Sequence, residues 1–184
     1  LDRRFHAEPI ACPVCGPHLE FITSLAPSPL RGERGLSDDA ALAAAVAALR
    51  AGKIVAAKGV GGYHLLCDAT NDTAVATLRV RKPRPTKPLA VMLRDLDALH
   101  SVVYTTPEME AFIASPERPI VLLPKRADST LSEQIAPGLA EIGCLLPYSP
   151  LHDLLLSDFG GPLVATSGNL SGEPVLTDNA EAQT

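Results

Sequence analysis

The basic stretch at residues 81–92, RKPRPTKPLAVM, contains the residue types that point most directly to ligand chemistry. No acidic side chain lies between residues 73 and 93, and three prolines fix φ, so the cationic groups are held on a stiff loop. A rigid fork of Arg and Lys suits a polyphosphate, because Arg makes bidentate contacts and Lys supplies a point charge. The alternative is a solvated surface loop. The cationic residues in this stretch and just before it are Arg79, Arg81, Lys82, Arg84 and Lys87.

A second candidate stretch, ATSGNLSGEP at residues 165–174, follows an apolar segment near the end of the sequence. Ser167 and Asn169 can donate hydrogen bonds from a turn after a strand. Gly168 between them lets the backbone approach a ligand closely. The alternative interpretation is an ordinary turn rich in Ser, Gly and Asn.

The third candidate, KGVGGYHLLCDAT at residues 58–70, places three glycines after a strand-like segment. It matches neither the P-loop nor the dinucleotide-binding pattern. The glycines still favour a backbone open to a small ligand, with Lys58 beside Gly61 and Gly62. Lys58 is equally well explained as a surface lysine with a buried stem. Cys67 is interpreted as a structural core residue.

Three further residues are weaker candidates for the same site. Arg118 precedes the strand-like segment PIVLLP, where a plain surface charge is the alternative. His64 and His152 are candidate acid–base groups, although hydrogen-bonded structural histidines are commoner.

Cys12 and Cys15, in the segment CPVCG, form half of a structural zinc site. Two thiolates two residues apart can bind one tetrahedral ion, but two ligands are still needed. Cys67 and Cys144 lie in strand-like core segments and are poor candidates to complete it. We therefore expect a zinc site that is incomplete in this sequence, with the partner ligands upstream.

The elements that must position these residues alternate along the sequence. Alternating strands and helices predict an α/β domain with a mixed, twisted sheet. Strands are expected at residues 53–58, 88–93, 119–124, 143–147 and 161–169. Helices are expected to begin at Ser37, at Asn71 or Asp72, at Asp95, at Thr106 and at Ser149.

Composition excludes several classes of protein. Apolar residues make up 46% of the 184 residues, but no apolar run is long enough for a membrane span. The first residues are charged and do not form a secretion signal, so we expect a cytoplasmic protein. A formal charge of −5 makes nucleic-acid binding the less favoured alternative, since nucleic-acid binders are usually basic overall.

Four stretches together resemble a known family: KGVGGYHLLCDA, KPRPTKPLAVM, LPYSPLH and GGPLVATSGNLSGEP. They are similar to the YrdC-like domain of the HypF family, the carbamoyltransferases of nickel–iron hydrogenase maturation. The Lys-x-Arg of Lys82 and Arg84, with the Ser-x-Asn of Ser167 and Asn169, is the signature of the YrdC superfamily. The resemblance covers about residues 38–184.

The N-terminal segment DRRFHAEPIACPVCGP resembles the end of the zinc-finger region that precedes this domain in the family. We therefore expect residues 1–36 to be a remnant of that region with a linker, and residues 37–184 to be the YrdC-like domain. The acylphosphatase domain, most of the zinc fingers and the C-terminal transfer domain are expected to lie outside this sequence.

The resemblance implies a YrdC-like mixed sheet with flanking helices around a positively charged cleft. It also implies a carbamoyl-adenylate synthase. Carbamate released from carbamoyl phosphate attacks the α-phosphorus of ATP, carbamoyl-AMP forms and pyrophosphate leaves. A neighbouring domain then passes the carbamoyl group to HypE. Because the substrate supplies the nucleophile, the protein must only align two anions and neutralise phosphate charge.

Residue roles carry over from the resemblance as expectations. Lys82, Arg84, Ser167 and Asn169 are expected to hold the phosphates, with Lys82 and Arg84 as the catalytic pair. Lys87 and Arg118 are further nucleotide contacts, and Lys58, Gly61 and Gly62 line the carbamate side. Mg²⁺ is expected to arrive with ATP, held mostly by phosphates and water.

Two other functions stay open at the level of the sequence. The tRNA-modifying branch of the superfamily makes threonylcarbamoyl-AMP, although it has a Pro-Thr-containing stretch where this sequence has KGVGG. An RNA-binding module using the basic loop predicts affinity that falls steeply with salt. An isolated domain that binds ATP without turnover is a further outcome.

Overall fold

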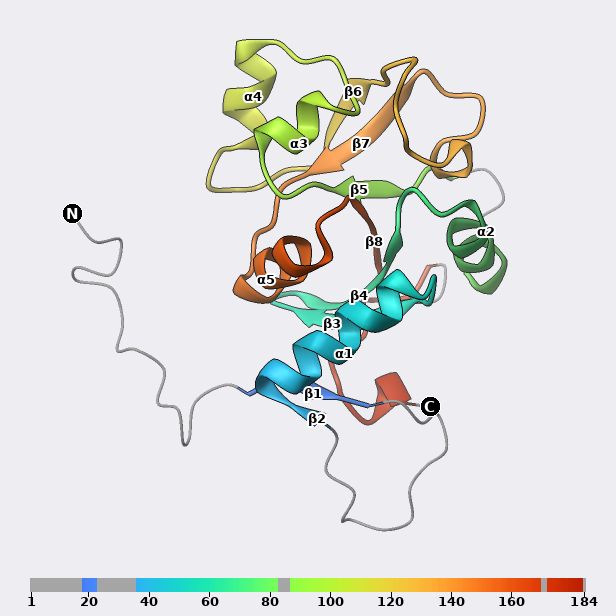
Figure 1. Ribbon diagram of the computed structural model, residues 1–184, viewed down its shortest axis with the longest axis vertical. Helices are drawn as coiled ribbons and strands as arrows, with labels where there is room; N and C mark the ends of the chain where they lie inside the picture. The colour runs from blue at the N-terminus through green and yellow to red at the C-terminus, as the bar shows by residue number, and fades with distance from the viewer. Residues whose placement is uncertain (1–17, 23–35, 83–86, 170–171, 184) are drawn as a thin grey trace, which may run out of the picture.

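The computed structural model describes residues 18–22, 36–82, 87–169 and 172–183 (Figure 1). Cys12, Cys15 and Arg84 lie outside these ranges, so the structure does not address the zinc half-site or one member of the predicted catalytic pair.

The described residues fold into a six-stranded mixed sheet with helices on both faces, and a small two-stranded sheet beside it. The strands are β1 Glu20–Phe21, β2 Leu36–Ser37, β3 Val55–Gly59, β4 Gly62–Asp68, β5 Ala90–Met92, β6 Val121–Pro124, β7 Glu141–Leu145 and β8 Leu163–Ser167. The helices are α1 Asp38–Arg50, α2 Asp72–Arg81, α3 Leu96–His100, α4 Pro107–Ile113 and α5 Pro150–Phe159, with short 3-10 turns η1 Glu133–Ile135 and η2 Glu181–Gln183.

The order of strands in the large sheet is β3-β4-β8-β5-β7-β6. Among these described strands only the β5–β7 pair is parallel, and the other four pairings are antiparallel. This register brings the end of β3, the start of β4 and the end of β8 together at one end of the strands, because Gly59 pairs with Gly62 and His64 with Ser167. The predicted mixed α/β sheet is confirmed.

Alternating side chains of the strands divide the core into two layers. Leu163 and Ala165 of β8 pack with α1 and α5, whereas Val164 between them packs with α2 and α3. Figure 1 shows α1 and α5 together on one face of the sheet, with α2 away from them. Apolar burial on both faces stabilises the inner strands and fixes where β8 ends.

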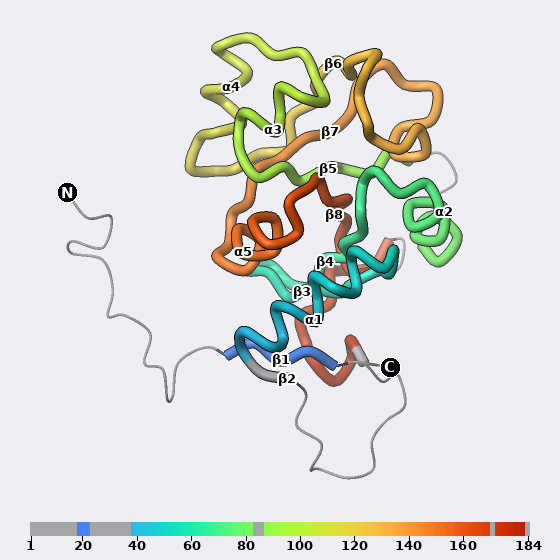
Figure 2. The backbone as a smooth tube through the Cα atoms, viewed as in Figure 1, coloured from blue at the N-terminus to red at the C-terminus, as the bar shows by residue number. Residues whose placement is uncertain are grey.

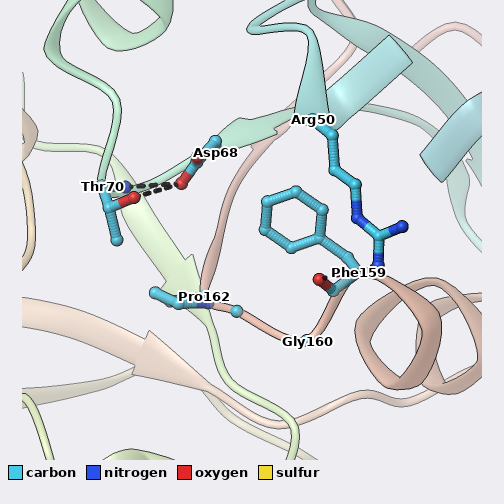
Figure 3. Close-up of a pocket in the computed structure, with 7 residues that line it drawn as sticks. Arg50, Asp68, Thr70, Phe159, Gly160 and Pro162 are labelled. Atoms are coloured by element: carbon cyan, nitrogen blue, oxygen red, sulfur yellow. Dashed lines mark hydrogen bonds between the residues drawn. The ribbon is translucent and has the colours of Figure 1, made fainter. Parts of the chain in front are cut away.

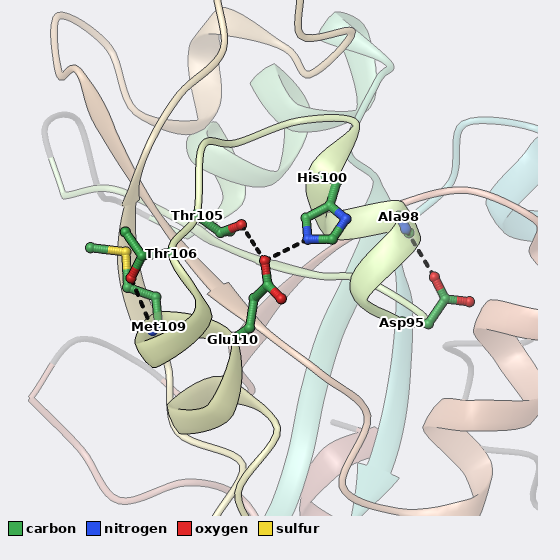
Figure 4. A network of polar contacts seen from close by, with 7 residues as sticks. All are labelled: Asp95, Ala98, His100, Thr105, Thr106, Met109 and Glu110. Atoms are coloured by element: carbon green, nitrogen blue, oxygen red, sulfur yellow. Dashed lines mark hydrogen bonds and ion pairs between the residues drawn. The ribbon is translucent and has the colours of Figure 1, made fainter.

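Four helices begin where side-chain caps are expected from the sequence. In each, a side-chain oxygen accepts a hydrogen bond from the backbone N–H three residues later, which satisfies a free donor of the first turn. The cap residues are Asn71, Asp95, Thr106 and Ser149. Figure 4 shows two of these caps beside Glu110, whose Oε1 lies 2.6 Å from Thr105 Oγ1 and 2.7 Å from His100 Nε2.

One inner strand differs from the expectation. The glycines after the first predicted strand favour a backbone open to a ligand, and no bounds are predicted for a strand around Cys67. In the structure Gly62–Asp68 form β4, which pairs with β3 on one side and β8 on the other. The other five strands of the large sheet occur where they are predicted, with boundaries shifted by one to two residues.

The C-terminal segment after β8 returns along β3 and β4 (Figure 2). Tyr63 N–H donates to Leu176 O at 2.8 Å, and Leu176 N–H donates to Gly168 O at 2.9 Å. At the other end of the chain, β1 pairs with β2 and thereby ties residues 20–21 to the start of α1. Among the described residues, no helix is long and apolar enough to cross a membrane.

Candidate functional site

Lys82 meets the Ser-x-Asn turn in space. α2 ends at Arg81, and its next residue, Lys82, is only 5% exposed. Lys82 Nζ lies 3.3 Å from Ser167 Oγ and 3.2 Å from Asn169 Oδ1, and it also donates to Ser167 O. Thr166 Oγ1 is a further neighbour at 3.3 Å. The ammonium group is therefore fixed at the end of β8 by hydroxyl, amide and carbonyl oxygens.

The turn itself is held in one shape by its own hydrogen bonds. Ser167 Oγ donates to Asn169 Oδ1 at 2.7 Å, and Asn169 Nδ2 donates to Glu173 O at 2.5 Å. Gly168 lies against β4, since a Cβ there would be 2.9 Å from Tyr63 Cβ and 3.0 Å from Tyr63 O. A side chain at position 168 would push the turn away from the sheet, so Gly168 is needed for packing.

The cationic residues of the basic stretch have different roles in the structure. Arg79 donates to backbone carbonyls of Ile135, at 2.8 Å, of Lys87, at 3.2 Å, and of Gln134, so it joins α2 to η1 and to the start of β5. The Lys87 side chain is exposed. Counting cations in the sequence could not separate the structural Arg79 from Lys82.

Lys58 contacts the returning C-terminal segment. Its Nζ donates to Asn179 Oδ1 at 2.7 Å and lies 5.8 Å from the centre of the Tyr63 ring, while Tyr63 Oη donates to the same Oδ1 at 3.1 Å. The assignment of Lys58 to a carbamate side stays a prediction, and these contacts give it a structural role as well.

The two glycines predicted beside Lys58 differ. Gly62 has φ +125°, and a Cβ there would lie 2.6 Å from Leu176 O. At Gly61 a Cβ would meet no atom of the described residues within 4 Å, so the space around it is open. Gly62 is therefore required by backbone conformation and close packing, whereas Gly61 is the one that leaves room for a ligand.

Arg118 is not brought beside Lys82 by the sheet. It lies in the turn before β6 with φ +47°, a conformation that non-glycine residues rarely adopt. β5 and β7 separate β6 from β8, which is about 14 Å of strand spacing. Its role in nucleotide binding stays a prediction without support from the topology.

Three rings form a cluster beside Gly59, at the end of the strands where Ser167 lies. They belong to His64, Tyr148 and His152. Tyr148 Oη lies 3.1 Å from His64 Nε2 and 3.2 Å from Nδ1. Burial, with the charge of Lys82 nearby, lowers the pKa of His64 below its usual value. Burial beside His64 lowers the pKa of His152 to about 4.

A pocket lies at the opposite edge of the sheet, lined by residues that include Arg50, Asp68 and Phe159 (Figure 3). Arg50 donates hydrogen bonds there to the carbonyl oxygens of Asp158 and Phe159, and Asp68 accepts from Thr70 N–H and Oγ1–H.

Within the described residues no group of three or more His, Cys, Asp and Glu side chains could hold a metal ion.

The mixed sheet, its flanking helices and the contact between the end of α2 and the end of β8 define an α/β domain of the YrdC-like fold. The chain belongs to the Sua5/YciO/YrdC family, whose model, described as telomere recombination, matches residues 47–184. A second model, described as the HypF finger, matches residues 1–22, which include Cys12 and Cys15.

Among individual relatives, a HypF carbamoyltransferase is more similar to this chain than a threonylcarbamoyl-AMP synthase is. The chain is 52% identical over 182 residues to carbamoyltransferase HypF of Rhodobacter capsulatus, covering 99% of this chain and 23% of the relative. It is 32% identical over 145 residues to threonylcarbamoyl-AMP synthase of Bacillus subtilis, covering 77% of this chain and 42% of that protein.

Solved structures agree with this placement. Full-length HypF in a phosphate- and nucleotide-bound form matches 98% of the chain with a TM-score of 0.81 and 44% identity, over 22% of its own length. HypF of T. kodakarensis matches with a TM-score of 0.85 and 41% identity, over 100% of this chain and 23% of that one. The chain thus spans less than a quarter of the length of these HypF proteins.

Proposed function

We propose that this chain is the carbamoyl-adenylate-forming part of a HypF-type carbamoyltransferase. In the proposed reaction a carbamate oxygen attacks the α-phosphorus of ATP. The bond from that phosphorus to the bridging oxygen breaks, and pyrophosphate leaves with the electron pair. The products are carbamoyl-AMP and pyrophosphate, and no proton must be transferred in this step.

The contact of Lys82 with Ser167 and Asn169 is the observation that carries the proposal. It joins the two halves of a predicted phosphate site that lie more than eighty residues apart in the sequence. The identity to HypF over 99% of the chain and the structural match to a nucleotide-bound HypF support the same assignment. The domain's role is to align two anions and offset the charge of the phosphates.

Each residue has a role in this proposal. Lys82 is fixed beside the Ser-x-Asn turn and contributes a positive charge there, while Ser167 and Asn169 offer a hydroxyl and an amide to phosphate oxygens. Arg84 and Lys87 on the basic loop add positive charge around the triphosphate. ATP enters with its own Mg²⁺, which the phosphates and water hold.

Further parts of the proposal concern the complete protein. Cys12 and Cys15, within the segment that matches the HypF finger, are proposed to bind structural Zn²⁺ together with ligands from upstream. Carbamoyl phosphate is the proposed source of carbamate, HypE the acceptor of the carbamoyl group, and the cytoplasm the place of reaction.

Pyrophosphate release tests the proposal directly. The chain is given ATP, Mg²⁺ and ammonium carbamate, which supplies carbamate without a second domain, with ammonium chloride and sodium bicarbonate as separate controls. We expect pyrophosphate release that depends on carbamate. Release that instead requires threonine together with bicarbonate would favour threonylcarbamoyl-AMP synthesis, the activity named for the Bacillus subtilis relative.

Calorimetric titration with ATP tests the site. A Lys82→Ala/Arg84→Ala double variant should lose at least tenfold in affinity, because two charge-assisted contacts are removed. A Lys53→Ala/Arg94→Ala variant is the matched control, since it also removes two positive charges but from exposed positions at the opposite edge of the sheet. Equal affinity for ATP in both variants would contradict the assignment.

A further inference from the structure

The ring cluster of His64, Tyr148 and His152 lies next to the proposed phosphate site and has no role in the reaction described above. His64 on β4 is paired directly with Ser167 on β8. Directly paired residues of antiparallel strands place their side chains on the same face, with Cβ atoms about 4.5–5.5 Å apart. His64 is therefore a cross-strand neighbour of the serine that Lys82 contacts.

The cluster combines one accessible ring with two supporting rings. His64 is half-buried, so a small ligand can reach its edge, whereas His152 is 1% exposed. The ring centres lie 5.8 Å apart for His64 and Tyr148, 5.5 Å for His64 and His152, and 4.7 Å for Tyr148 and His152. All three pairs meet edge to face, which holds the His64 ring in one orientation.

Gly59 lies directly against the cluster. A Cβ at this position would be 3.3 Å from His64 Nδ1, 3.3 Å from His152 Cε1 and 3.4 Å from Tyr148 Oη. The absence of a side chain at Gly59 therefore leaves just enough room for the three rings. Gly59, the last residue of β3, therefore serves this cluster as well as the hairpin.

The polar atoms of the cluster are only partly used within the described residues. Neither ring nitrogen of His152 has a hydrogen-bond partner there, although buried polar groups nearly always have one. Tyr148 Oη can bond one nitrogen of His64 at a time, which leaves the other nitrogen of that ring for a ligand. The cluster thus offers neutral hydrogen-bonding groups beside a fixed positive charge.

We propose that the His64 nitrogen not bonded by Tyr148 accepts a hydrogen bond from the amino group of carbamate, and that Tyr148 and His152 are positioning residues that hold its ring toward the end of β8. This inference rests on the proposed function, which supplies carbamate as the substrate. Carbamate has an anionic end that Lys82 attracts and an N–H₂ end that a neutral imidazole nitrogen can accept from. A neutral ring also leaves the attacking oxygen free, because it does not form an ion pair with the carboxylate.

The lowered pKa values of His64 and His152 agree with this arrangement. Both rings are neutral at neutral pH, since burial and the nearby charge of Lys82 disfavour the protonated form of His64. Lys82 therefore has two effects at this end of the strands: it attracts the anions, and it adds to the effect of burial that lowers the pKa of the adjacent imidazole.

The test measures pyrophosphate release against carbamate concentration, and ATP affinity by calorimetry, for His64→Ala and His64→Gln. We expect His64→Ala to raise the half-saturating carbamate concentration about tenfold or more, while the Kd for ATP changes less than twofold. His64→Gln should recover part of the loss, because an amide can both donate and accept. Tyr148→Phe, which removes a single hydroxyl and keeps the packing of the ring, should raise the half-saturating concentration about threefold.

His100→Gln is the matched control, because His100 is a partly exposed histidine on α3 that contacts Glu110, outside the cluster. An unchanged carbamate dependence in both His64→Ala and Tyr148→Phe would overturn this inference but leave the proposed function standing. An equal loss of ATP and carbamate affinity would overturn it too, since His64 would then support the fold or the nucleotide. If the unmodified chain binds ATP but releases no pyrophosphate with carbamate, the proposed function fails, and this inference fails with it.

Discussion

Lys82 Nζ lies 3.3 Å from Ser167 Oγ, so the C-terminal ends of α2 and β8 meet although 85 residues separate them in the sequence. The contact depends on both cores of the domain. Leu78 of α2 is buried against one face of the sheet, and Ala165 of β8 against the other. The position of the ammonium group is therefore set by packing rather than by the flexible end of a surface side chain.

Ser167→Ala should weaken ATP binding about three- to tenfold and lower the free energy of unfolding by about 1 kcal/mol. The change removes the hydroxyl that donates to Asn169 Oδ1 and contacts Lys82 Nζ. Ser101→Ala is the control, because its hydroxyl also makes one local hydrogen bond, to Ala98 O, but at the end of α3. Calorimetry with ATP and urea denaturation check both effects, and equal ATP affinity in the two variants would contradict the role of Ser167.

Gly62→Ala should destabilise the fold by about 2 kcal/mol or more, whereas Gly61→Ala should change the free energy of unfolding by less than about 0.5 kcal/mol. Position 62 has φ +125° and would place a Cβ 2.6 Å from Leu176 O, while position 61 has open space. Urea denaturation of both variants measures the difference. Similar losses for the two neighbours would show that the C-terminal segment does not pack on β4 as described.

The structure around these glycines could not be predicted from the local sequence pattern. Glycines after a strand are typical of a ligand loop, but Gly62 begins β4, and residues 62–68 have no alternating pattern because an inner strand is covered on both faces. The close contact with Leu176 comes from a segment more than a hundred residues away. No local pattern could predict it.

Other parts of the fold could be predicted because their causes are local. The caps at Asn71, Asp95, Thr106 and Ser149 each satisfy a backbone donor three residues later, and that chemistry is visible in the sequence. The meeting of Lys82 with Ser167 and Asn169 could be expected from the resemblance to the YrdC superfamily, whose signature joins Lys-x-Arg to Ser-x-Asn. The role of Tyr148 could not, although Tyr148 lies in LPYSPLH, one of the stretches that resemble the family, because its ring partners become visible only when β4 and α5 are placed together.

Cys67 and Cys144 should not react with a thiol reagent such as DTNB while the domain is folded. Both are fully buried, and burial raises the pKa of each thiol to about 12, so almost no reactive thiolate is present at neutral pH. The measurement uses a Cys12→Ser/Cys15→Ser variant, whose two remaining thiols are Cys67 and Cys144. Both should react in urea, and fast reaction without urea would contradict the burial of β4 and β7.

His152 should make the stability of the domain fall as pH is lowered from about 6.5 to about 4. Its pKa is lowered from 6.5 to about 4 in the folded state, because the buried ring lies beside His64. Between these two values the unfolded chain binds a proton that the folded chain does not, so acid favours unfolding in this window. His64, whose pKa is also lowered, acts in the same direction.

His152→Leu removes this titration with a side chain of similar size that is favourable in a helix. Between pH 7 and pH 4.5 the unmodified chain should lose about 2 kcal/mol more stability than the variant. At pH 7 the variant should be at least as stable, because it no longer buries two ring nitrogens that lack partners among the described residues. Urea denaturation at several pH values gives both quantities. Parallel pH dependence of the two proteins would mean that His152 is not buried as a neutral ring between β4 and α5.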